Sequence, residues 1–356
     1  MIGLLSKTVL LPYFIILKIR HLCYDRGWIK SKKYSTPVIC VGNITVGGTG
    51  KTPHTEMIIR HLGPSARIAV LSRGYKRKSK GFRIVEISDT FSESGDEPLQ
   101  IKQKFPQITV AVCKDRIEGV DRLLAMERKP DIILLDDAFQ YRKIVPSHSI
   151  LLIDSGRSIE GDNLLPIGRL RDLPCQIRRA DSVVITKCSL AVEYENGIID
   201  EAATGKVLQS ERERWRKSLG LRKEQGLYFS SIVYKRPVAV FENEADTRYL
   251  YSRVAICFSA IANDRLFKNH IAAEYNLLDS IRFADHKSFS RSDMKLISGM
   301  SAKYPLAVVF TTEKDCKRLA SCSFVDEEVK RRLFYIPVET EILLEKERKA
   351  FFDALK

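Results

Sequence analysis

The sequence predicts an α/β protein in which a mainly parallel sheet is covered by helices on both faces and is followed by a second, smaller α/β lobe. Three observations predict this class. From Pro37 onward, short β-branched runs alternate with helical stretches, the order of elements that builds a parallel sheet. The apolar runs are continuous rather than alternating, as in strands buried on both faces. The chain has 356 residues, more than one core usually supports, so two lobes are expected.

Residues 1–30 are expected to form an apolar helix that lies on a membrane surface. The uncharged segment Val9 to Leu17 is followed by the cations Lys18, Arg20, Arg26, Lys30, Lys32 and Lys33. This segment is too short to span a bilayer, which takes about 20 apolar residues, but it suits an interfacial helix on anionic lipid. The alternatives are a helix packed on its own domain and a cleaved signal peptide. Pro12 and the lack of a small-x-small cleavage site argue against the signal peptide.

Residues 31–230 are expected to form the first lobe around six buried strands. These strands are predicted at Val38–Val41, Ile68–Leu71, Ile108–Val112, Ile132–Leu135, Ile150–Ile153 and Val183–Ile185. Around Arg212 to Arg236 the sequence changes to a charged helix and ends in a Lys-Arg-Pro break, which places a boundary near residue 230. Val254–Phe258 and Ala307–Phe310 begin the strands of the second lobe, residues 231–356.

A glycine-rich segment between the first strand and the next helix is interpreted as an ATP-binding P-loop. The residues expected to bind the nucleotide are Thr45, Val46, Gly47, Gly48, Thr49, Gly50, Lys51 and Thr52. The backbone N–H groups of such a loop, with the following helix N-terminus, bind phosphate. Lys51 would reach the β- and γ-phosphates, and Thr52 would ligate Mg²⁺. The strict Walker A pattern needs glycine where Thr45 stands, yet the three glycines that follow supply the flexibility.

The run from Pro130 to Asp137 has the form of a Walker B strand. Its apolar residues would bury the strand, and Asp136 and Asp137 would emerge at its C-terminal end, where one of them would hold magnesium. Parallel α/β sheets bind ligands at the carboxyl ends of their strands, so this motif and the P-loop are expected to converge on one site. A solvent-facing turn is the alternative.

The composition limits the partners. The formal net charge of +15 favours nucleic acid, anionic lipid headgroups or polyphosphates. The basic clusters lie far apart and lack a recognisable nucleic-acid module, so no nucleic-acid binding is expected. The eight cysteines are scattered without a C-x-x-C pair and are interpreted as reduced thiols of a cytosolic protein. The few histidines lack zinc-site spacing, which argues against a structural metal.

Several segments together resemble the tetraacyldisaccharide 4'-kinase family, in the family's order, from about residue 38 to residue 318. They are Gly42 to Pro53, Leu71 to Tyr75, Gly95 to Pro98, Asp136 to Gln140, Leu164 to Asp172, Ala260 to Asn263, Asp285-His286 and Thr311 to Asp315. The resemblance implies two α/β lobes and ATP- and Mg²⁺-dependent phosphorylation of the 4'-hydroxyl of a tetraacylated glucosamine disaccharide 1-phosphate. It also implies peripheral attachment to the cytoplasmic face of a Gram-negative inner membrane. A monomer is expected.

The resemblance also implies roles for individual residues. Asp96 would be the general base and His286 its partner, with Lys51, Asp136 and Asp137 completing the catalytic set. The residues expected to contact the lipid substrate are Asn43, Arg73, Gln140, Arg171 and Asp172. The sequence departs from the family at three positions: Ala138 and Tyr141 replace glycine and histidine, and Asp172 replaces glutamate. The shorter side chain of Asp172 puts a direct contact with substrate or metal in question.

Two other function classes share parts of this pattern. Membrane-bound ATPase switches of the partitioning or targeting type carry a lysine immediately before the paired glycines, and Val46 stands at that position here. A P-loop kinase for a soluble metabolite would not need the apolar N-terminal helix. A dependence of activity on detergent would separate the three functions.

Overall fold

The structure is a computed structural model and describes residues 2–75, 77–157, 159–188, 194–195, 198–199, 201–261, 264–284, 287, 289–319, 322 and 324–355. Two compact units make up the chain. One contains Met1–Ser231 together with Thr340–Lys356, and the other contains Ile232–Glu339. The strands β12 and β18 contain the residues at which the units divide.

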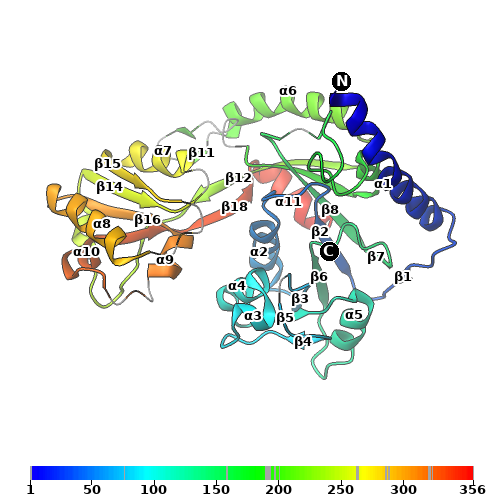
Figure 1. Ribbon diagram of the computed structural model, residues 1–356, viewed down its shortest axis with the longest axis horizontal. Coiled ribbons are helices and arrows are strands. Elements are labelled where there is room, and N and C mark those ends of the chain that lie inside the picture. Colours follow the sequence, from blue (N-terminus) through cyan, green and yellow to red (C-terminus); the bar gives the residue numbers. More distant parts are fainter. Residues whose placement is uncertain are drawn as a thin grey trace. The chain divides into compact units, whose positions relative to one another are not determined.

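A nine-stranded sheet forms the centre of the first unit, in the order β18-β12-β9-β8-β2-β6-β3-β5-β4 (Figure 1). The strands are β2 (Val38–Gly42), β3 (Ile68–Ser72), β4 (Arg83–Ile84), β5 (Thr109–Val112), β6 (Ile132–Asp136), β8 (His148–Asp154), β9 (Ser182–Thr186), β12 (Gly226–Tyr234) and β18 (Val338–Ile342). From β12 to β5 all neighbours are parallel, and β4 is antiparallel at one edge. All six strands predicted for the first lobe are confirmed, as is the α/β class.

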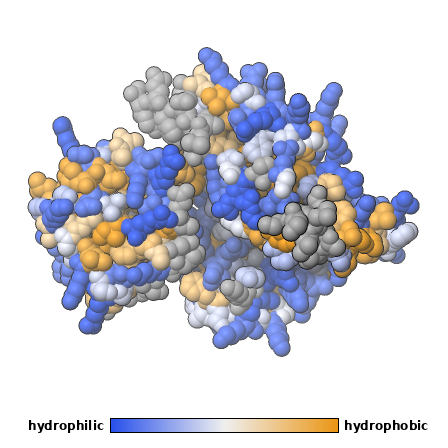
Figure 2. All heavy atoms as spheres, turned by 45° about the horizontal axis from the view of Figure 1, so that its top comes forward, coloured by the Kyte–Doolittle hydropathy of each residue, from blue (hydrophilic) through white to orange (hydrophobic). Residues whose placement is uncertain are grey.

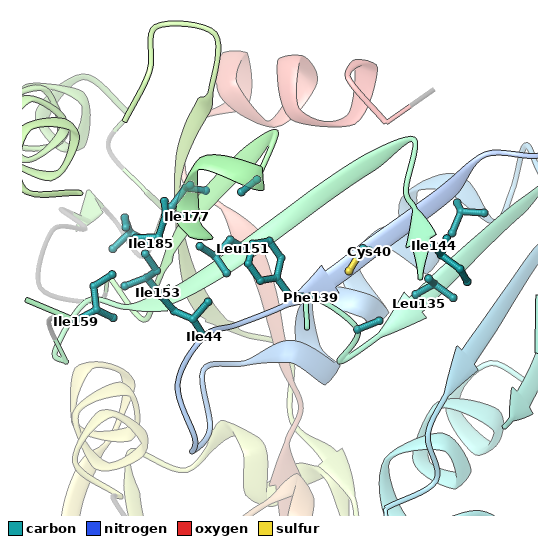
Figure 3. Close-up of a cluster of buried hydrophobic side chains, with 14 of the residues drawn as sticks. Cys40, Ile44, Leu135, Phe139, Ile144, Leu151, Ile153, Ile159, Ile177 and Ile185 are labelled. Atoms are coloured by element: carbon teal, nitrogen blue, oxygen red, sulfur yellow. The ribbon is translucent and has the colours of Figure 1, made fainter. Parts of the chain in front are cut away.

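Helices cover both faces of this sheet because alternate residues of each strand point to opposite sides. Ile39 and Val41 of β2 share one buried cluster with α2 (Lys51–Leu62), α4 (Asp96–Lys104) and α11 (Glu345–Asp353). Val38 and Cys40 share the other with α1 (Ile2–Asp25), α5 (Arg116–Leu124), η1 (Pro174–Arg179) and α6 (Glu201–Leu219). Figure 3 shows part of this second cluster, where Cys40, Leu151 and Phe139 lie along the sheet. The remaining elements are the short helix α3 (Phe91–Ser94), the parallel pair β1 (Lys32–Lys33) and β7 (Ile144–Val145), and the antiparallel pair β10 (Tyr194–Glu195) and β11 (Ile198–Ile199).

The N-terminal apolar segment lies within α1, which includes Pro12. Its second half packs on the first unit through Leu17 and His21, which are both buried. Among the residues that the structure describes, no helix is both long enough and apolar enough to cross a membrane.

The second unit contains a five-stranded sheet in the order β13-β17-β16-β14-β15. Its strands are β13 (Val238–Ala239), β14 (Val254–Ser259), β15 (Asn276–Arg282), β16 (Val308–Thr312) and β17 (Leu333–Ile336). The predicted strands β14 and β16 are confirmed and are parallel neighbours. Three helices, α8 (Arg291–Lys303), α9 (Glu313–Leu319) and α10 (Glu327–Arg332), contribute to the core on one face. On the other face lie α7 (Arg265–Glu274) and the short helix η3 (Thr247–Tyr251).

The C-terminal segment groups differently from the sequence-based division, which placed residues 231–356 together. Thr340–Lys356 belongs to the first unit. The reason is aromatic packing: Phe352 stacks on His61 of α2 at 3.6 Å between ring centres, and Phe351 meets Tyr228 of β12 edge-on at 5.1 Å. Both phenylalanines are buried, so α11 completes the core of the first unit.

Candidate active site

The P-loop joins β2 to α2, at the carboxyl end of the parallel sheet. Gly47 and Gly50 have φ angles of 105° and 87°, a region that side chains other than glycine rarely occupy. Two hydrogen bonds hold the loop around Thr49. Its hydroxyl accepts from the Asn43 amide at 2.7 Å, and its carbonyl accepts from the Thr186 hydroxyl of β9 at 3.1 Å. The loop is therefore fixed from both its own strand and a neighbouring one.

His54, in the first turn of α2, connects the P-loop to β12 through two hydrogen bonds. Its Nδ1 lies 2.7 Å from the carbonyl of Gly50, and its Nε2 lies 2.8 Å from the hydroxyl of Ser230. Burial lowers the pKa of His54 to about 4, although the bond to Gly50 acts in the opposite direction. The imidazole is therefore neutral at pH 7, with Nδ1 donating to Gly50 and Nε2 accepting from Ser230.

Lys51, Asp137 and Arg171 meet beside the loop. The Lys51 ammonium lies 3.9 Å from Asp137 Oδ1, and Arg171 donates from Nη1 to Asp137 Oδ2 at 3.0 Å. Asp137 has a φ of 52°, and such strain in a non-glycine residue clusters at functional sites. Burial raises the pKa of Asp137, but the hydrogen bond and charge of Arg171, with the charge of Lys51, outweigh it and hold the pKa below its usual value. Arg171 also donates to the Asn43 side chain, so Asn43 and Asp137 together fix the position of the Arg171 guanidinium.

Asp136 lies at the end of β6 with no exposed surface. Its Oδ1 accepts from the Thr55 hydroxyl at 3.3 Å, and its Oδ2 has no hydrogen-bond partner among the described residues. Burial raises the pKa of Asp136 to about 7, aided by the negative charges of Glu97 and Asp137. The pKa of Glu97 is itself raised, chiefly by desolvation. The unpartnered Oδ2 of Asp136 and the raised pKa values of Asp136 and Glu97 together favour a bound cation. A cation would contact the unpartnered oxygen and offset the negative charge of the neighbouring carboxylates.

A groove of about 1140 Å³ opens beside these residues, entirely within the first unit. The predicted residues that line it are Thr45, Val46, Gly47, Lys51, Arg73, Asp96, Asp137, Gln140 and Arg171. Asn43, Thr49, Thr52 and Asp136 lie behind this surface and are buried. Gly48 is exposed and Gly50 half-buried, and neither is part of the groove wall. His286 lies outside the described residues.

Arg116 is a groove residue that the sequence analysis missed. Its side chain is 4% exposed and makes no ion pair within the described part of the chain. Nη1 donates to the carbonyls of Cys113 and Lys114, while Nε has no partner there. Buried cations are normally paired, so an anionic group on a ligand is the natural counterpart. The only signal in the sequence was its position just after a strand and an aspartate N-cap.

Tyr141 helps to hold this arginine. Its hydroxyl donates to Asp115 Oδ1 at 2.7 Å and accepts from the Arg116 backbone at 3.2 Å. The Arg116 guanidinium lies 5.7 Å from the tyrosine ring centre, within cation–π range. Tyr141 therefore positions the segment that carries Arg116. Glu97 is also part of the groove wall. It has no role in the sequence-based assignment, because Asp96 is the functional residue expected in the segment Gly95 to Pro98.

Asp172 points away from the groove. Its side chain is fully buried, with Oδ1 2.6 Å from His21 Nε2 and accepting from the Leu173 backbone at 2.9 Å. Arg142 Nη1 lies 3.0 Å from the other nitrogen of His21. The structure thus gives Asp172 the role of an anchor for α1, and its carboxylate is not part of the groove wall in which a substrate contact was expected.

Replacing His21 with alanine is expected to lower the free energy of unfolding by about 1–3 kcal/mol, because the fully buried Asp172 then loses its shortest contact and keeps only the Leu173 backbone N–H and Arg179, whose Nη2 lies 3.5 Å from Oδ2. Urea unfolding followed by circular dichroism measures this loss. The double variant H21L/D172L should be more stable than the sum of the single losses predicts, because it removes both members of the His21–Asp172 contact together. Additive losses would show that the two side chains do not act as a pair.

α1 also touches the backbone of two groove residues. The Arg20 guanidinium donates to the carbonyl of Gln140 at 2.7 Å, and the Tyr13 hydroxyl donates to the carbonyl of Arg171 at 3.4 Å. The Gln140 side chain in turn donates to the carbonyl of Asn43 at 2.7 Å. The apolar helix and the phosphate-binding end of the sheet are thus connected through direct contacts.

Comparisons with known proteins identify the family. The sequence profile of the family described as Tetraacyldisaccharide-1-P 4'-kinase matches residues 4–356. The chain is similar to the tetraacyldisaccharide 4'-kinases of Parabacteroides distasonis, 37% identical over 346 residues, and Porphyromonas gingivalis, 37% identical over 351 residues. These alignments cover 95% and 96% of this chain, and 89% and 93% of the relatives. A crystal structure of LpxK from Aquifex aeolicus in complex with ATP is similar over 98% of this chain and 99% of its own, with a TM-score of 0.66 and 27% identity.

Proposed function

The chain belongs to the tetraacyldisaccharide 4'-kinase family, and on this basis we propose that it transfers the γ-phosphoryl group of ATP to the 4'-hydroxyl of a tetraacyldisaccharide 1-phosphate. The product is the 4'-phosphorylated lipid A precursor. One observation supports placing this reaction in the groove of the first unit. Lys51, Asp137 and Arg171 contact one another at the P-loop, and they line the same groove as Asp96.

In the proposed mechanism, the protein mainly aligns the two reactants and neutralises charge, because phosphoryl transfer passes through a loose transition state. The P-loop N–H groups and Lys51 hold the phosphates. Arg171, fixed by Asn43 and Asp137, adds a second positive charge beside the transferred group. Asp96 accepts the proton of the 4'-hydroxyl, and His286 acts with it. Arg73 and Gln140, which also line the groove, contact the sugar.

The residues present fit a magnesium ion that accompanies ATP. In the described residues there is no cluster of three or more His, Cys, Asp or Glu side chains arranged to hold a metal. Magnesium needs no such cluster, since it usually takes one or two protein carboxylates together with substrate phosphates and water. The free Oδ2 of Asp136, the Asp137 carboxylate and the Thr52 hydroxyl are the protein groups that would hold it. Bound there, the ion would offset negative charge on the β- and γ-phosphates.

Asp136→Asn is expected to raise the magnesium concentration for half-maximal activity by about tenfold or more. Asp137→Asn should raise it less, because both oxygens of Asp137 are already engaged by Arg171. Magnesium titrations of the initial rate at saturating ATP compare the two variants. An equal shift, or a larger one for Asp137→Asn, would reverse the assignment of the main metal ligand.

The direct test of the proposed function is incubation with γ-labelled ATP and the purified disaccharide 1-phosphate lipid. We expect label to appear on the lipid and the rate to depend on detergent. Hydrolysis of ATP without labelled lipid would instead support an ATPase switch. Transfer to a water-soluble sugar at the same rate as to the lipid would support a soluble-metabolite kinase.

We further propose that α1 attaches the protein, as a monomer, to the cytoplasmic face of the inner membrane. The exposed apolar side chains of α1 and the turn after it are Leu11, Phe14, Ile15, Ile16, Ile19, Leu22, Trp28 and Ile29. In Figure 2, apolar side chains gather at the right of the view, the side on which α1 lies in Figure 1. Exposed apolar surface interleaved with cations such as Lys18 and Arg26 is typical of an interfacial helix.

Substituting Phe14, Ile16 and Ile19 together with serine is expected to weaken binding to anionic vesicles at least tenfold. These side chains are 40%, 61% and 55% exposed, so the fold and ATP affinity should not change. Vesicle sedimentation measures the binding. Deleting the helix is a poorer test, because it would also remove the buried partner of Asp172.

The matched control replaces three exposed leucines of the second unit, Leu278, Leu296 and Leu306, with serine. It should sediment like the unmodified protein. If the α1 variant also sediments fully, the membrane contact lies elsewhere, and the basic clusters become the first candidates.

A further inference from the structure

A second cavity adjoins the groove, and every charged residue along its described wall is positive. It has a volume of about 520 Å³. Its wall consists of residues between β3 and β4, namely Arg73, Gly74, Tyr75, Arg77, Ser79, Lys80 and Gly81, together with Lys114 after β5. The charged residues in its wall are Arg73, Arg77, Lys80 and Lys114, and among the described residues no carboxylate lines it. Four cations without a counter-charge in the wall give a strongly positive pocket, which favours an anionic ligand.

The loop that forms this cavity is shaped by internal bonds. Gly74 and Gly81 have positive φ angles, and a Cβ on Gly74 would lie 2.4 Å from Arg77 Cδ. Arg77 donates to the Ser79 hydroxyl at 3.2 Å and to the Gly81 carbonyl at 2.5 Å. Ser79 in turn donates to the carbonyl of Glu93 at 2.5 Å. The arginine is thus positioned by the loop itself rather than by an ion pair.

The two lysines of the pocket differ from Arg77 in having no bonding partner among the described residues. Lys80 and Lys114 are exposed, and neither side chain takes part in a hydrogen bond or ion pair with the described residues. Both ammonium groups are therefore available to a ligand at no cost in broken contacts. Phosphate monoesters are suited to such a site, because several cations can surround their oxygens at once.

The cavity is continuous with the catalytic groove. Arg73, Tyr75, Gly81 and Lys114 belong to the walls of both. A disaccharide that presents its 4'-hydroxyl to the P-loop carries its own 1-phosphate at the opposite end, away from Lys51. That phosphate needs a positive environment that is connected to the groove but separate from the nucleotide site.

We propose that the basic pocket of Arg73, Arg77, Lys80 and Lys114 binds the 1-phosphate of the acceptor lipid and so distinguishes it from lipids that lack this group. The inference rests on the proposed function, because it takes the acceptor to be a disaccharide 1-phosphate. The pocket positions the acceptor, and its cations do not touch the transferred phosphoryl group.

The test compares two acceptors in neutral detergent micelles: the tetraacyldisaccharide 1-phosphate and the same lipid with a free 1-hydroxyl. The unmodified protein should prefer the phosphorylated acceptor by about tenfold or more in kcat/KM, since hydrogen bonds to charged groups each contribute close to a tenfold factor. The double variant K80M/K114M should lose this preference, through a higher KM for the phosphorylated acceptor. The single variant K80M, whose lysine lines the pocket and not the groove, should lose part of the preference while its kcat, its KM for ATP and its activity on the 1-hydroxyl lipid stay unchanged.

Lys78→Met is the matched control. Lys78 is an exposed lysine of the same loop that does not line the pocket. It should keep the preference for the 1-phosphate. If Lys78→Met and the double variant lose the same share of the preference, a diffuse positive field rather than the pocket attracts the lipid. If the double variant loses the same factor in kcat/KM on both acceptors, the effect is merely structural. Either result overturns the proposal.

Two further arms separate other sources of phosphate. If the defect of the double variant appears only when anionic phospholipid is added to the micelles, and equally for both acceptors, the pocket binds bilayer headgroups and the proposal fails. If a substitution of Arg116, and not of the two lysines, removes the preference, the 1-phosphate binds in the groove instead. Failure of the unmodified protein to label either lipid would refute the kinase function itself, whereas labelling both lipids equally would refute only the pocket.

Discussion

Lys51→Ala is expected to reduce phosphoryl transfer by about 10³-fold or more while leaving the fold intact. Lys51 is the lysine of the P-loop, and its ammonium lies beside Asp137 and Arg171 at the mouth of the groove. A charge placed where negative charge develops in the transition state contributes more to the rate than to ground-state binding. The loss should therefore appear mainly in kcat, measured by transfer of labelled phosphate to the lipid.

The fold should survive because Asp137 keeps its two contacts with Arg171 when Lys51 is removed. A thermal melt within a few degrees of the unmodified protein checks this. Lys32→Ala is a matched control, since Lys32 is an exposed lysine of the same unit that pairs with Asp121, away from the groove wall. Near-normal turnover by Lys51→Ala would contradict the nucleotide-site assignment.

The strands and the P-loop could be predicted because their signals are local. A buried parallel strand such as β6 is a continuous apolar run, and its carboxylates at the C-terminal end are visible as a motif. A phosphate-binding loop likewise needs glycine, lysine and threonine at fixed spacing between a strand and a helix. In each case a few neighbouring residues determine the local structure, so a single sequence is enough to predict it.

The residues that the sequence could not place depend on distant partners. Asp172 is an anchor rather than a groove residue because His21, 151 positions earlier, lies against it. Arg116 is held in part by Tyr141, 25 positions later, whose hydroxyl accepts from the Arg116 backbone and whose ring lies near the guanidinium. The last helix belongs to the first unit because Phe352 stacks on His61. No local pattern encodes such pairings, which exist only after the chain has folded.

Asp96→Asn and His286→Ala are each expected to lower kcat by about 10²- to 10⁴-fold, the usual contribution of a positioned general base. Asp96 is the first residue of α4 and lines the groove that contains Lys51 and Asp137. Neither residue belongs to the P-loop, so the affinity for ATP should change little. Steady-state rates at saturating lipid, with ATP binding measured separately, distinguish these effects.

The double variant D96N/H286A decides whether the two residues form one catalytic unit. Residues that act as a unit are strongly non-additive, because removing either one disables the same step. If Asp96 takes the proton and His286 supports it in that role, the double variant should be hardly slower than the slower single variant. If the losses multiply instead, the two side chains serve separate steps. Asp96 would then remain the candidate base on its position in the groove, and His286 would need a different role, such as binding the substrate.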